Sequence, residues 1–413
     1  MNRPTSPTPQ QEPQPTPGST SDRSWNPARL FETLTYFDVL PFSDTMRWLQ
    51  SLWSGGSAAS SPMLFAPDSV TSRRPIVGLL DPLGTLPSGL AAKFEVLGLA
   101  TLDLGDGGLA RLTDRDLLVA IVVGAAANFP AAELDGAIAR LDADLTPQTV
   151  FDFSREDIDL RALWGSVDDV VMGGVSESQA IAMPKTMRFA GNVSTANSGG
   201  FASIRTRAIS PALDLRGVAA SEPDAARQLG ANTGLELRLT GDGNRYKFIL
   251  RDREAWDGVA HCYSFDTQPD AAIAVRVPFA ECVPTFRAKS VPDSPRLDGS
   301  AIAAFQLMLS KFEYDRQLNP AFTSGAFQLD VASVSAYRKP VVAPIVMAGE
   351  TAAIAVLRSA LGDRAAGLNL RQLDLATAIA AISRNSTDAD NFDNSGDASN
   401  ELTASIARHF TLA

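Results

Sequence analysis

The pattern of hydrophobic and polar positions changes near residue 148 of this chain. Between residues 74 and 128, apolar runs alternate with helix-like stretches in the order RPIVGLLD, LPSGLAAKFEVLG, ATLDLGD and DLLVAIVVGAA. Strands that are apolar throughout are typical of a parallel sheet with helices on both faces. This pattern predicts an α/β region over residues 74–147.

Between residues 185 and 337 the apolar positions instead recur at every second residue, in short runs separated by turn signals. Such runs are typical of an antiparallel sandwich or barrel. In GLELRLTGDGNRYKFILRD, residues 234–252, leucines alternate with polar residues before GDGN, and large apolar residues alternate after it, which predicts a β-hairpin. Further strands are expected in 185–194, 199–209, 273–279, 303–309 and 327–331. We therefore predict a mainly β, jelly-roll type sandwich over residues 148–338.

The N-terminal part of the chain matches neither pattern. Residues 1–28 are rich in Pro, Ser, Thr and Gln and lack the apolar stretch of a secretory signal, so they are expected to form a disordered tail. Residues 29–62 are expected to form an aromatic amphipathic segment followed by a Gly/Ser/Pro linker. The aromatic part, residues 30–53, is split by Pro41 and would either dock on the protein's own core or make peripheral contact with a membrane.

The C-terminal part, residues 339–413, is rich in Ala and Leu at helical spacing. The stretches ETAAIAVLRSALGD, LRQLDLATAIAAIS and NELTASIARHF predict helices, with a polar loop at residues 383–399.

Composition limits the function classes. The chain has 413 residues, of which 45% are hydrophobic and 20% charged, which is typical of a folded protein with more than one domain. A formal net charge of −11 makes nucleic acid an unlikely partner, because phosphate binding needs clustered Lys and Arg. Two cysteines are too few for a disulfide framework or a zinc site and fit a cytoplasmic, reducing compartment. No metal is expected, since His261 and His409 lie far apart.

The first turn of the α/β region can be compared with a dinucleotide-binding fingerprint. In that fingerprint, glycines let the backbone approach a pyrophosphate at a helix N-terminus. The corresponding positions here are Gly78, Asp81 and Gly84, so the middle glycine is replaced by an acidic side chain. The region is therefore interpreted as a partial, degenerate Rossmann-like remnant, and no cofactor is expected. No Tyr-x-x-x-Lys pair is evident either. A residual NAD(P)-binding, short-chain dehydrogenase-like protein is kept as an alternative.

The sequence WGSVDDVVMGGVSES, residues 164–178, carries the clearest motif. Together with F-x-G-x-V at residues 189–193, NSGGFASIR at 197–205 and GAFQLDVASVSAY at 325–337, it resembles the complex I intermediate-associated protein 30 family. The resemblance implies a sandwich similar to galactose-binding and carbohydrate-binding modules, and an assembly factor that is not an enzyme. The wider layout resembles cyanobacterial and chloroplast proteins in which this sandwich is fused to an atypical short-chain dehydrogenase domain.

That resemblance also implies partners and a location. The partners would be subunits of a membrane-bound electron-transfer complex, of the photosystem or the respiratory NADH dehydrogenase type. The protein would be cytoplasmic, or peripheral on the thylakoid or plasma membrane. A carbohydrate-binding module is the other alternative, with Trp164, Lys247 and Trp256 as groove candidates.

Several residues of the motif are candidates for binding. Trp164 is either a core residue or a stacking platform. Asp168 and Asp169 would act as a general acid/base pair only if they converged; side chains of adjacent strand residues diverge, so capping of the Met-Gly-Gly turn is favoured over ligand contact and catalysis. No catalytic residue is therefore assigned.

The resemblance also implies that two glycine-rich segments, at residues 173–174 and 199–200, lie together at one place on the sandwich. Arg205, Lys247 and Arg251 are interpreted either as solvated charges on an outer face or as a basic strip on a concave sheet. The remaining partner or ligand candidates are Met172, Gly173, Gly174, Ser176, Asn197, Gly200, Phe201 and Ser203.

Overall fold

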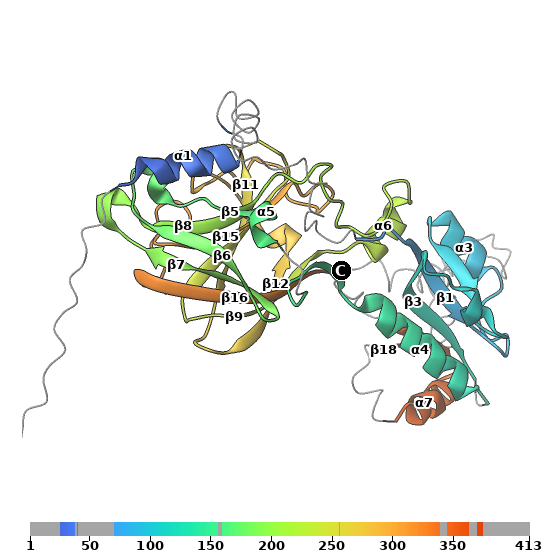
Figure 1. Ribbon diagram of the computed structural model, residues 1–413. Coiled ribbons are helices and arrows are strands. Elements are labelled where there is room, and N and C mark those ends of the chain that lie inside the picture. Colours follow the sequence, from blue (N-terminus) through green and yellow to red (C-terminus); the bar gives the residue numbers. More distant parts are fainter. Residues whose placement is uncertain are drawn as a thin grey trace, which may run out of the picture.

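The computed structural model describes residues 25–37, 39, 70–126, 128–155, 159–255, 257–338, 345–362 and 370–374. An antiparallel β-sandwich and a smaller α/β unit lie side by side (Figure 1). The chain builds three strands of the α/β unit, continues through the sandwich and then returns to add two more strands. The sandwich is thus an insertion within the α/β unit.

The α/β unit is built on a parallel sheet. Within the described residues its strand order is β18-β17-β3-β1-β2, and all neighbouring pairs are parallel. The strands are β1 (Arg74–Leu80), β2 (Ala100–Asp103), β3 (Asp116–Ala125), β17 (Ile345–Gly349) and β18 (Leu370–Asp374). Every residue of β3 is buried, as its uninterrupted apolar run predicts.

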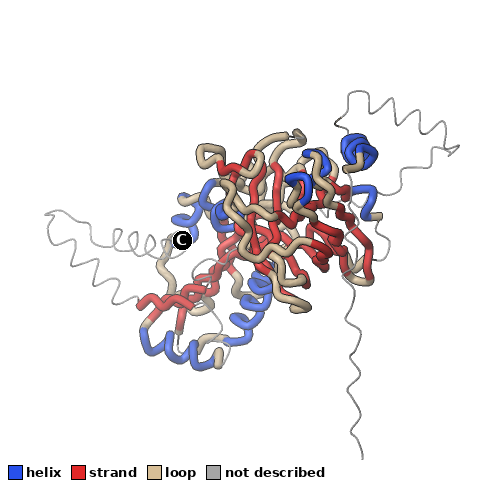
Figure 2. The backbone as a smooth tube through the Cα atoms, turned by 90° about the vertical axis from the view of Figure 1, so that its left-hand side faces the viewer, coloured by secondary structure: helices blue, strands red, loops and turns tan. Residues whose placement is uncertain are grey.

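Helices cover both faces of this sheet (Figures 1 and 2). One face packs against α4 (Ala131–Leu145) and α7 (Thr351–Ala360). The other packs against α3 (Leu90–Val96) and α6 (Asp224–Gly230). A short 3-10 helix, η1 (Gly108–Arg111), follows β2 and packs on the α4 side through Leu109. Helix α6 lies between two strands of the sandwich in sequence, so the insertion supplies part of the sheet's cover.

The prediction that residues 339–413 are helical is wrong for two segments. ETAAIAVLRSALGD does contain α7, but β17 precedes it and LRQLD forms β18. Both segments are only five residues long, so their patterns do not distinguish helix from strand. Pairing with β3 and with each other decides the outcome. The loop at 383–399 and the last expected helix lie outside the described residues.

The sandwich consists of two antiparallel sheets, named here after a central strand. In the described residues the β10 sheet has the order β14-β13-β11-β10-β15-β8-β5, and the β9 sheet has the order β12-β9-β16-β7-β6 with β4 also paired to β16. The β10 sheet contains β5 (Trp164–Ser166), β8 (Phe201–Thr206), β10 (Arg245–Arg251), β11 (Ala260–Asp266), β13 (Val283–Phe286), β14 (Lys289–Ser290) and β15 (Ala304–Ser310). The β9 sheet contains β4 (Gln148–Asp152), β6 (Glu177–Met183), β7 (Thr186–Val193), β9 (Gly234–Thr240), β12 (Ala272–Pro278) and β16 (Gly325–Tyr337).

Short helices connect these strands: α5 (Leu160–Leu163), η2 (Asp169–Met172), η3 (Ala196–Ser198) and η4 (Phe279–Glu281). The interior between the sheets is apolar and rich in aromatic side chains, with Phe151, Phe189 and Tyr246 fully buried. The alternating runs in the sequence thus correspond to strands whose inward residues fill one shared core.

The predicted hairpin at GDGN is wrong, although both of its strands are present. β9 pairs with β12 and β16, whereas β10 pairs with β11 and β15 in the opposite sheet. The Asp242 carboxylate accepts hydrogen bonds at 3.0 Å from the Tyr246 hydroxyl in one sheet and the Gln328 N–H in the other. The turn is therefore an arch, and the two apolar rows face each other across the core.

Helix α1 (Pro27–Tyr36) lies on the sandwich (Figure 1). The Asn26 side chain caps it by accepting a hydrogen bond from the Ala28 N–H, and Pro27 occupies its first turn. The described residues of the 30–53 segment thus contact the sandwich surface rather than its core. Residues 1–24 and 40–62 lie outside the described part, so the disordered tail, the linker and the membrane contact stay predictions. Among the described helices, none has both the length and the apolarity required to cross a bilayer.

Candidate functional site

A buried polar cluster lies where the chain leaves β5, enters β6 and enters β8. It consists of Asp168, Asp169, Ser176, Ser178 and Ser203, all less than 9% exposed, and is called the carboxylate knot below. Its two carboxylates bind backbone N–H groups of segments that are distant in sequence. The knot therefore joins the edge of the β10 sheet to the edge of the β9 sheet.

The two glycine-rich segments lie together, as expected, and the side chain that joins them is that of Asp169. Its carboxylate accepts hydrogen bonds from the Ser176 N–H at 2.9 Å, the Ser176 hydroxyl at 2.7 Å and the Gly200 N–H at 2.7 Å. A Cβ atom on Gly174 or Gly199 would lie 2.3 or 2.5 Å from the Asp169 carboxyl group. Glycine is thus required at both positions by the close approach of this carboxylate.

Asp168 points to a different set of donors. It accepts hydrogen bonds from the Ser178 N–H at 2.9 Å, the Ser178 hydroxyl at 2.6 Å and the Ser203 N–H at 2.9 Å. Arg29 of α1 adds an ion pair at 3.1 Å. Burial raises the pKa of Asp168 to about 6, although these hydrogen bonds and Arg29 act in the opposite direction.

The two carboxylates therefore serve as caps on backbone and hydroxyl groups. They diverge as expected, but the cause is the 3-10 turn η2 that begins at Asp169 rather than an extended strand. The capped groups also differ from the prediction, because the N–H donors belong to Ser176, Ser178, Gly200 and Ser203 rather than to the Met-Gly-Gly turn. In the turn itself, Gly173 and Gly174 donate to backbone carbonyls.

Sequence reasoning missed Ser178 as a member of the knot. A signal was present, because Ser176 and Ser178 are two residues apart in the VSES sequence. On an extended strand, residues two apart point to the same side. This spacing presents one hydroxyl to each of the two adjacent aspartates.

The outer side of the knot carries exposed apolar residues. Met172 at the tip of η2 is 68% exposed, and Gly173 beside it has a φ of +92°. Gly200 contacts Lys311, which precedes Phe312 and its bridge partner Leu318. Phe312 and Leu318 are 40% and 64% exposed.

The other candidates of the glycine-rich segments lie at different depths. Asn197 is exposed in η3 with a φ of +52°, a left-handed conformation that Asn tolerates. Phe201 is half-buried, and its N–H reaches the Asp169 carboxylate at 3.3 Å. The surface candidates are therefore Met172, Gly173 and Asn197, whereas the serines and Gly200 are internal.

Trp164 is a core residue. It is 4% exposed, and its ring packs against Phe151 and Phe153 at centroid distances of 5.8 and 6.4 Å. A stacking platform for a sugar would need an accessible face. Of the other groove candidates, Lys247 is 5% exposed and Trp256 lies outside the described residues.

The interpretation of Arg205 and Lys247 as solvated charges is wrong. Both lie on the outer face of the β10 sheet, yet Arg205 is only 4% exposed. Lys247 donates to the carbonyls of Phe312 and Glu313 at 2.6 and 3.1 Å, and burial lowers its pKa. Burial, assisted by the charge of Arg251, lowers the pKa of Arg205 to about 9. The segment that contains Phe312 and Glu313 packs on this face, and the number of charged residues in the sequence does not predict such packing.

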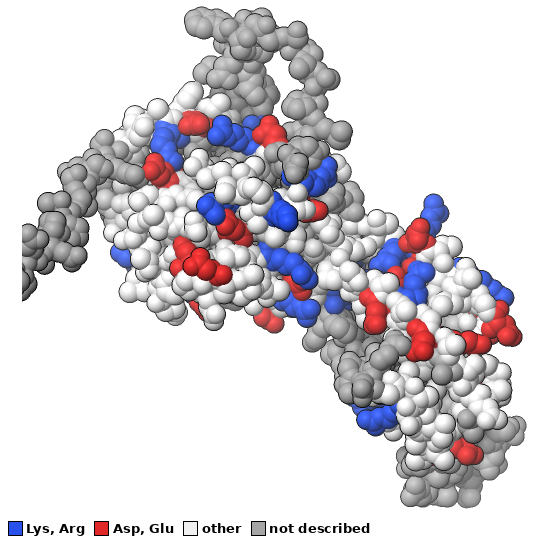
Figure 3. All heavy atoms as spheres, turned by 60° about the horizontal axis from the view of Figure 1, so that its bottom comes forward, with Lys and Arg blue, Asp and Glu red and all other residues white. Residues whose placement is uncertain are grey.

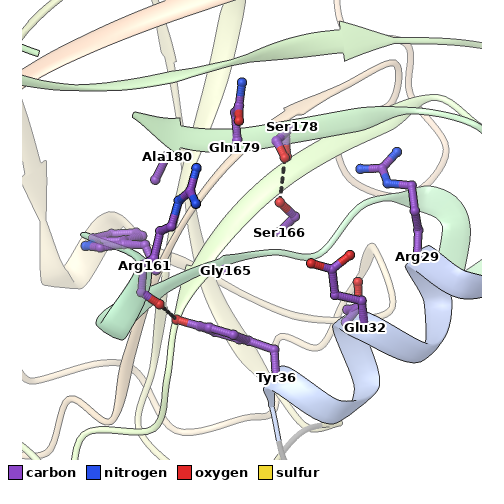
Figure 4. A pocket seen from close by; sticks show the side chains of 11 residues that line it. Arg29, Glu32, Tyr36, Arg161, Gly165, Ser166, Ser178, Gln179 and Ala180 are labelled. Atoms are coloured by element: carbon purple, nitrogen blue, oxygen red, sulfur yellow. Dashed lines mark hydrogen bonds between the residues drawn. The ribbon is translucent and has the colours of Figure 1, made fainter. Parts of the chain in front are cut away.

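A cavity of about 370 Å³ lies between α1 and the edges of β5 and β6 (Figure 4). Arg29, Glu32 and Tyr36 reach toward it from α1, and Arg161 and Gln179 line the sandwich side. The Ser166 hydroxyl donates to the Ser178 carbonyl at 2.5 Å beneath it. The cavity is thus bounded by charged and polar groups and adjoins the knot.

The fingerprint positions of the α/β unit lie at the carboxyl end of β1. The Asp81 carboxylate accepts hydrogen bonds from the N–H groups of Thr85 and Leu86, both at 2.8 Å, so it occupies donors that an anion would need. Gly78 lies within β1 against Leu104, and Gly84 adopts a φ of +67° in the following turn. A cavity of about 380 Å³ adjoins this loop, with Asp103 at its far side.

Neither the charges on the face shown in Figure 3 nor the metal-ligand residues of the described part indicate a further site. On the face shown in Figure 3, acidic and basic side chains are interspersed rather than gathered into a block of one sign. Within the described residues, no cluster of three or more His, Cys, Asp or Glu side chains is arranged to hold a metal ion. Cys262 and Cys282 are both buried and free.

Comparisons with known proteins identify the sandwich sequence. An uncharacterised protein of Schizosaccharomyces pombe is 31% identical over 117 residues, which are 26% of this chain and 50% of that protein. The chain therefore spans about half the length of this curated relative. The family 11 carbohydrate-binding module of a Clostridium thermocellum cellulosomal cellulase is 15% identical, with 47% of this chain and 95% of that chain covered and a TM-score of 0.31. An agarase is 10% identical, with coverages of 46% and 24% and a TM-score of 0.29.

The family model of Complex I intermediate-associated protein 30 matches residues 151–331. This range begins in β4 and ends in β16, and it includes the whole carboxylate knot. The sandwich of this chain therefore contains a Complex I intermediate-associated protein 30 domain over residues 151–331, as the motif from Trp164 to Ser176 predicted.

Proposed function

We propose that this protein is a non-enzymatic assembly factor that binds a subunit of a membrane-bound electron-transfer complex through its sandwich. The client would belong to a photosystem or to a respiratory complex of the NADH dehydrogenase type. The family to which residues 151–331 belong carries complex I in its name, which supports a client of this kind.

One observation carries the proposal: the carboxylate knot fixes the backbone that presents Met172. Asp169 closes the η2 turn onto Ser176 and Gly200, and Met172 extends from that turn with 68% of its surface exposed. An exposed apolar side chain on a rigid turn loses little conformational entropy when a partner covers it. Flexible, polarisable Met side chains also suit contact with varied apolar surfaces.

The state of the two aspartates favours binding over catalysis. A general acid or base needs an accessible oxygen at hydrogen-bonding distance from its substrate. Asp169 is fully buried and Asp168 is 1% exposed, and the oxygens of both accept hydrogen bonds from the protein. Their role in the proposal is to maintain the shape of the docking surface.

The test uses immobilised full-length protein and detergent-solubilised membranes that contain the electron-transfer complexes. The wild-type chain should enrich identified subunits of one complex in quantitative mass spectrometry. Met172→Glu should reduce that enrichment about tenfold or more, because it places a charge in an apolar contact. Val96→Glu is the matched control, since Val96 is 82% exposed on α3 of the α/β unit. Equal enrichment by both variants, or no enriched subunit at all, would contradict the proposal.

A further inference from the structure

Helix α1 covers a surface of the sandwich whose main features are formed by residues of the sandwich itself. The Asp168 carboxylate is held by Ser178 and Ser203, and both of these residues belong to the sandwich. Gly165 in β5 leaves space for the Tyr36 ring, since a Cβ atom there would lie 2.4 Å from it. The sandwich thus offers an anchoring charge and a ring-sized recess as features of its own.

The described contacts near the N-terminal end of α1 with this surface are polar. Arg29 donates to the Ser176 carbonyl at 3.0 Å and pairs with Asp168, and the Trp25 indole donates to the Val170 carbonyl at 3.0 Å. Thr33, at 7% exposed, is the one buried residue of the helix. The helix therefore rests on the sandwich without contributing large side chains to its core.

The C-terminal end of α1 adds two aromatic contacts. The Tyr36 ring lies 4.2 Å from the Arg207 guanidinium, and the Phe37 ring lies 5.8 Å from that of Arg205. The Tyr36 hydroxyl also donates to the Arg161 carbonyl at 2.9 Å. Stacking on cations is one way in which a short segment gains specificity without a large apolar area.

The interface is also incompletely filled. The cavity of about 370 Å³ in Figure 4 separates part of α1 from β5 and β6. The side chains of α1 thus do not fill the space between the described part of the helix and these strands. A helix of ten residues is, moreover, too short to be stable alone in water, so α1 depends on its contact with the sandwich for its own structure.

We propose that α1 is a displaceable occupant of a helix-binding surface, and that a client helix of the same chemistry replaces it. Such a helix carries a basic side chain that reaches Asp168 and, about two turns later, aromatic side chains that stack on Arg205 and Arg207. This inference rests on the proposed function and specifies the partner. Because α1 also contacts η2, its departure would widen the docking surface around Met172.

The test measures, by fluorescence anisotropy, the binding of a fluorescein-labelled synthetic peptide of residues 24–39 to three full-length chains. These are the wild type, Tyr36→Ala, and Tyr36→Ala combined with Arg207→Gln. Tyr36→Ala should loosen α1 in cis and bind the peptide at least about tenfold more tightly than the wild type, in which tethered α1 competes at high effective concentration. Adding Arg207→Gln to that variant should remove the gain in affinity, because it removes the guanidinium on which the Tyr36 ring of the peptide stacks. A peptide with Ala at the position of Tyr36 serves as the specificity control.

The inference is overturned if the peptide does not bind Tyr36→Ala, or if it binds all three chains alike. Circular dichroism and thermal unfolding verify each fold, and Arg29→Ala is the second loosening variant. If both loosening variants unfold, α1 is an integral part of the fold and the inference is wrong. Because no client is present, failure here leaves the Met172→Glu result intact, so the two proposals can fail separately. Subunits captured by the wild-type chain should release the bound peptide, and failure to do so would overturn the assignment to a client.

Discussion

Replacing Asp169 with Ala should strongly destabilise the sandwich. The substitution removes the acceptor of two fully buried N–H groups, those of Ser176 and Gly200, and weakens the bonding of the Ser176 hydroxyl. A buried donor left without a partner costs about 1–3 kcal/mol, so two N–H groups cost about 2–6 kcal/mol. Typical domains have a total free energy of unfolding of about 5–15 kcal/mol, so this is a large part of it.

Urea unfolding of the full chain, followed by tryptophan fluorescence and circular dichroism, measures this effect. Asp330→Ala is the matched control in the same sandwich, because Asp330 pairs with Arg188 at 2.7 Å near the surface. That pair should contribute no more than about 1 kcal/mol. If Asp169→Ala costs no more than Asp330→Ala, the reasoning about the knot is refuted.

Three further predictions follow from the same contacts. The pKa of Asp168 is raised from its ordinary 3.8 to about 6, so its protonated form stabilises the folded chain, and this stabilisation is complete below pH 3.8. Up to about 3 kcal/mol of the free energy of unfolding is lost as the pH rises through 6. Asp168→Asn should abolish this dependence of stability on pH, measured by urea unfolding at a series of pH values. Gly174→Ala should cost about 1–3 kcal/mol, because its Cβ would overlap the Asp169 carboxyl group, whereas Gly258→Ala, with open space around its Cβ, should be close to neutral in thermal unfolding. NADPH titrated to about 1 mM should show no saturable change in its fluorescence, because Asp81 occupies the loop N–H groups; a Kd below that concentration would contradict this interpretation.

The sequence predicts the strands of the sandwich better than their partners. Period-two alternation located β7 to β10, β12, β15 and β16, because one face of each strand packs into the core. The same alternation fits a hairpin and an arch equally well, since both place the apolar rows inside. The pairing of β9 with β12 and β16, and of β10 with β11 and β15, distinguishes them, and most of these pairs join strands that are far apart in sequence.

In the site, likewise, the sequence identifies the residues involved but not their hydrogen-bond partners. The motif marks Asp168, Asp169 and the glycines as a unit, and short Asp side chains near paired glycines indicate capping. The donors that they cap include Ser203 and Gly200, more than 30 residues away in sequence, and no local pattern predicts which N–H meets which oxygen. The burial of Arg205 and Lys247 depends on segments packed over the sheet, which charge spacing does not reveal.

The α/β unit was predicted in its first half only. Continuous apolar runs identify β1 and β3, whereas β17 and β18 are short and follow the inserted sandwich, so their pairing with β3 is a long-range effect. A parallel sheet is what the structure shows. Descent of this sheet from a dehydrogenase stays a prediction.

Amide hydrogen exchange of Ser176, Ser178, Gly200 and Ser203 tests most directly whether the paired aspartates hold these segments as one rigid unit. Each of the four N–H groups donates to Asp168 or Asp169. We predict that they exchange together, with the slow rates of the sandwich core, and that Asp169→Asn speeds exchange at Ser176 and Gly200 first. Exchange of these amides in the wild type as fast as in exposed loops would contradict the account.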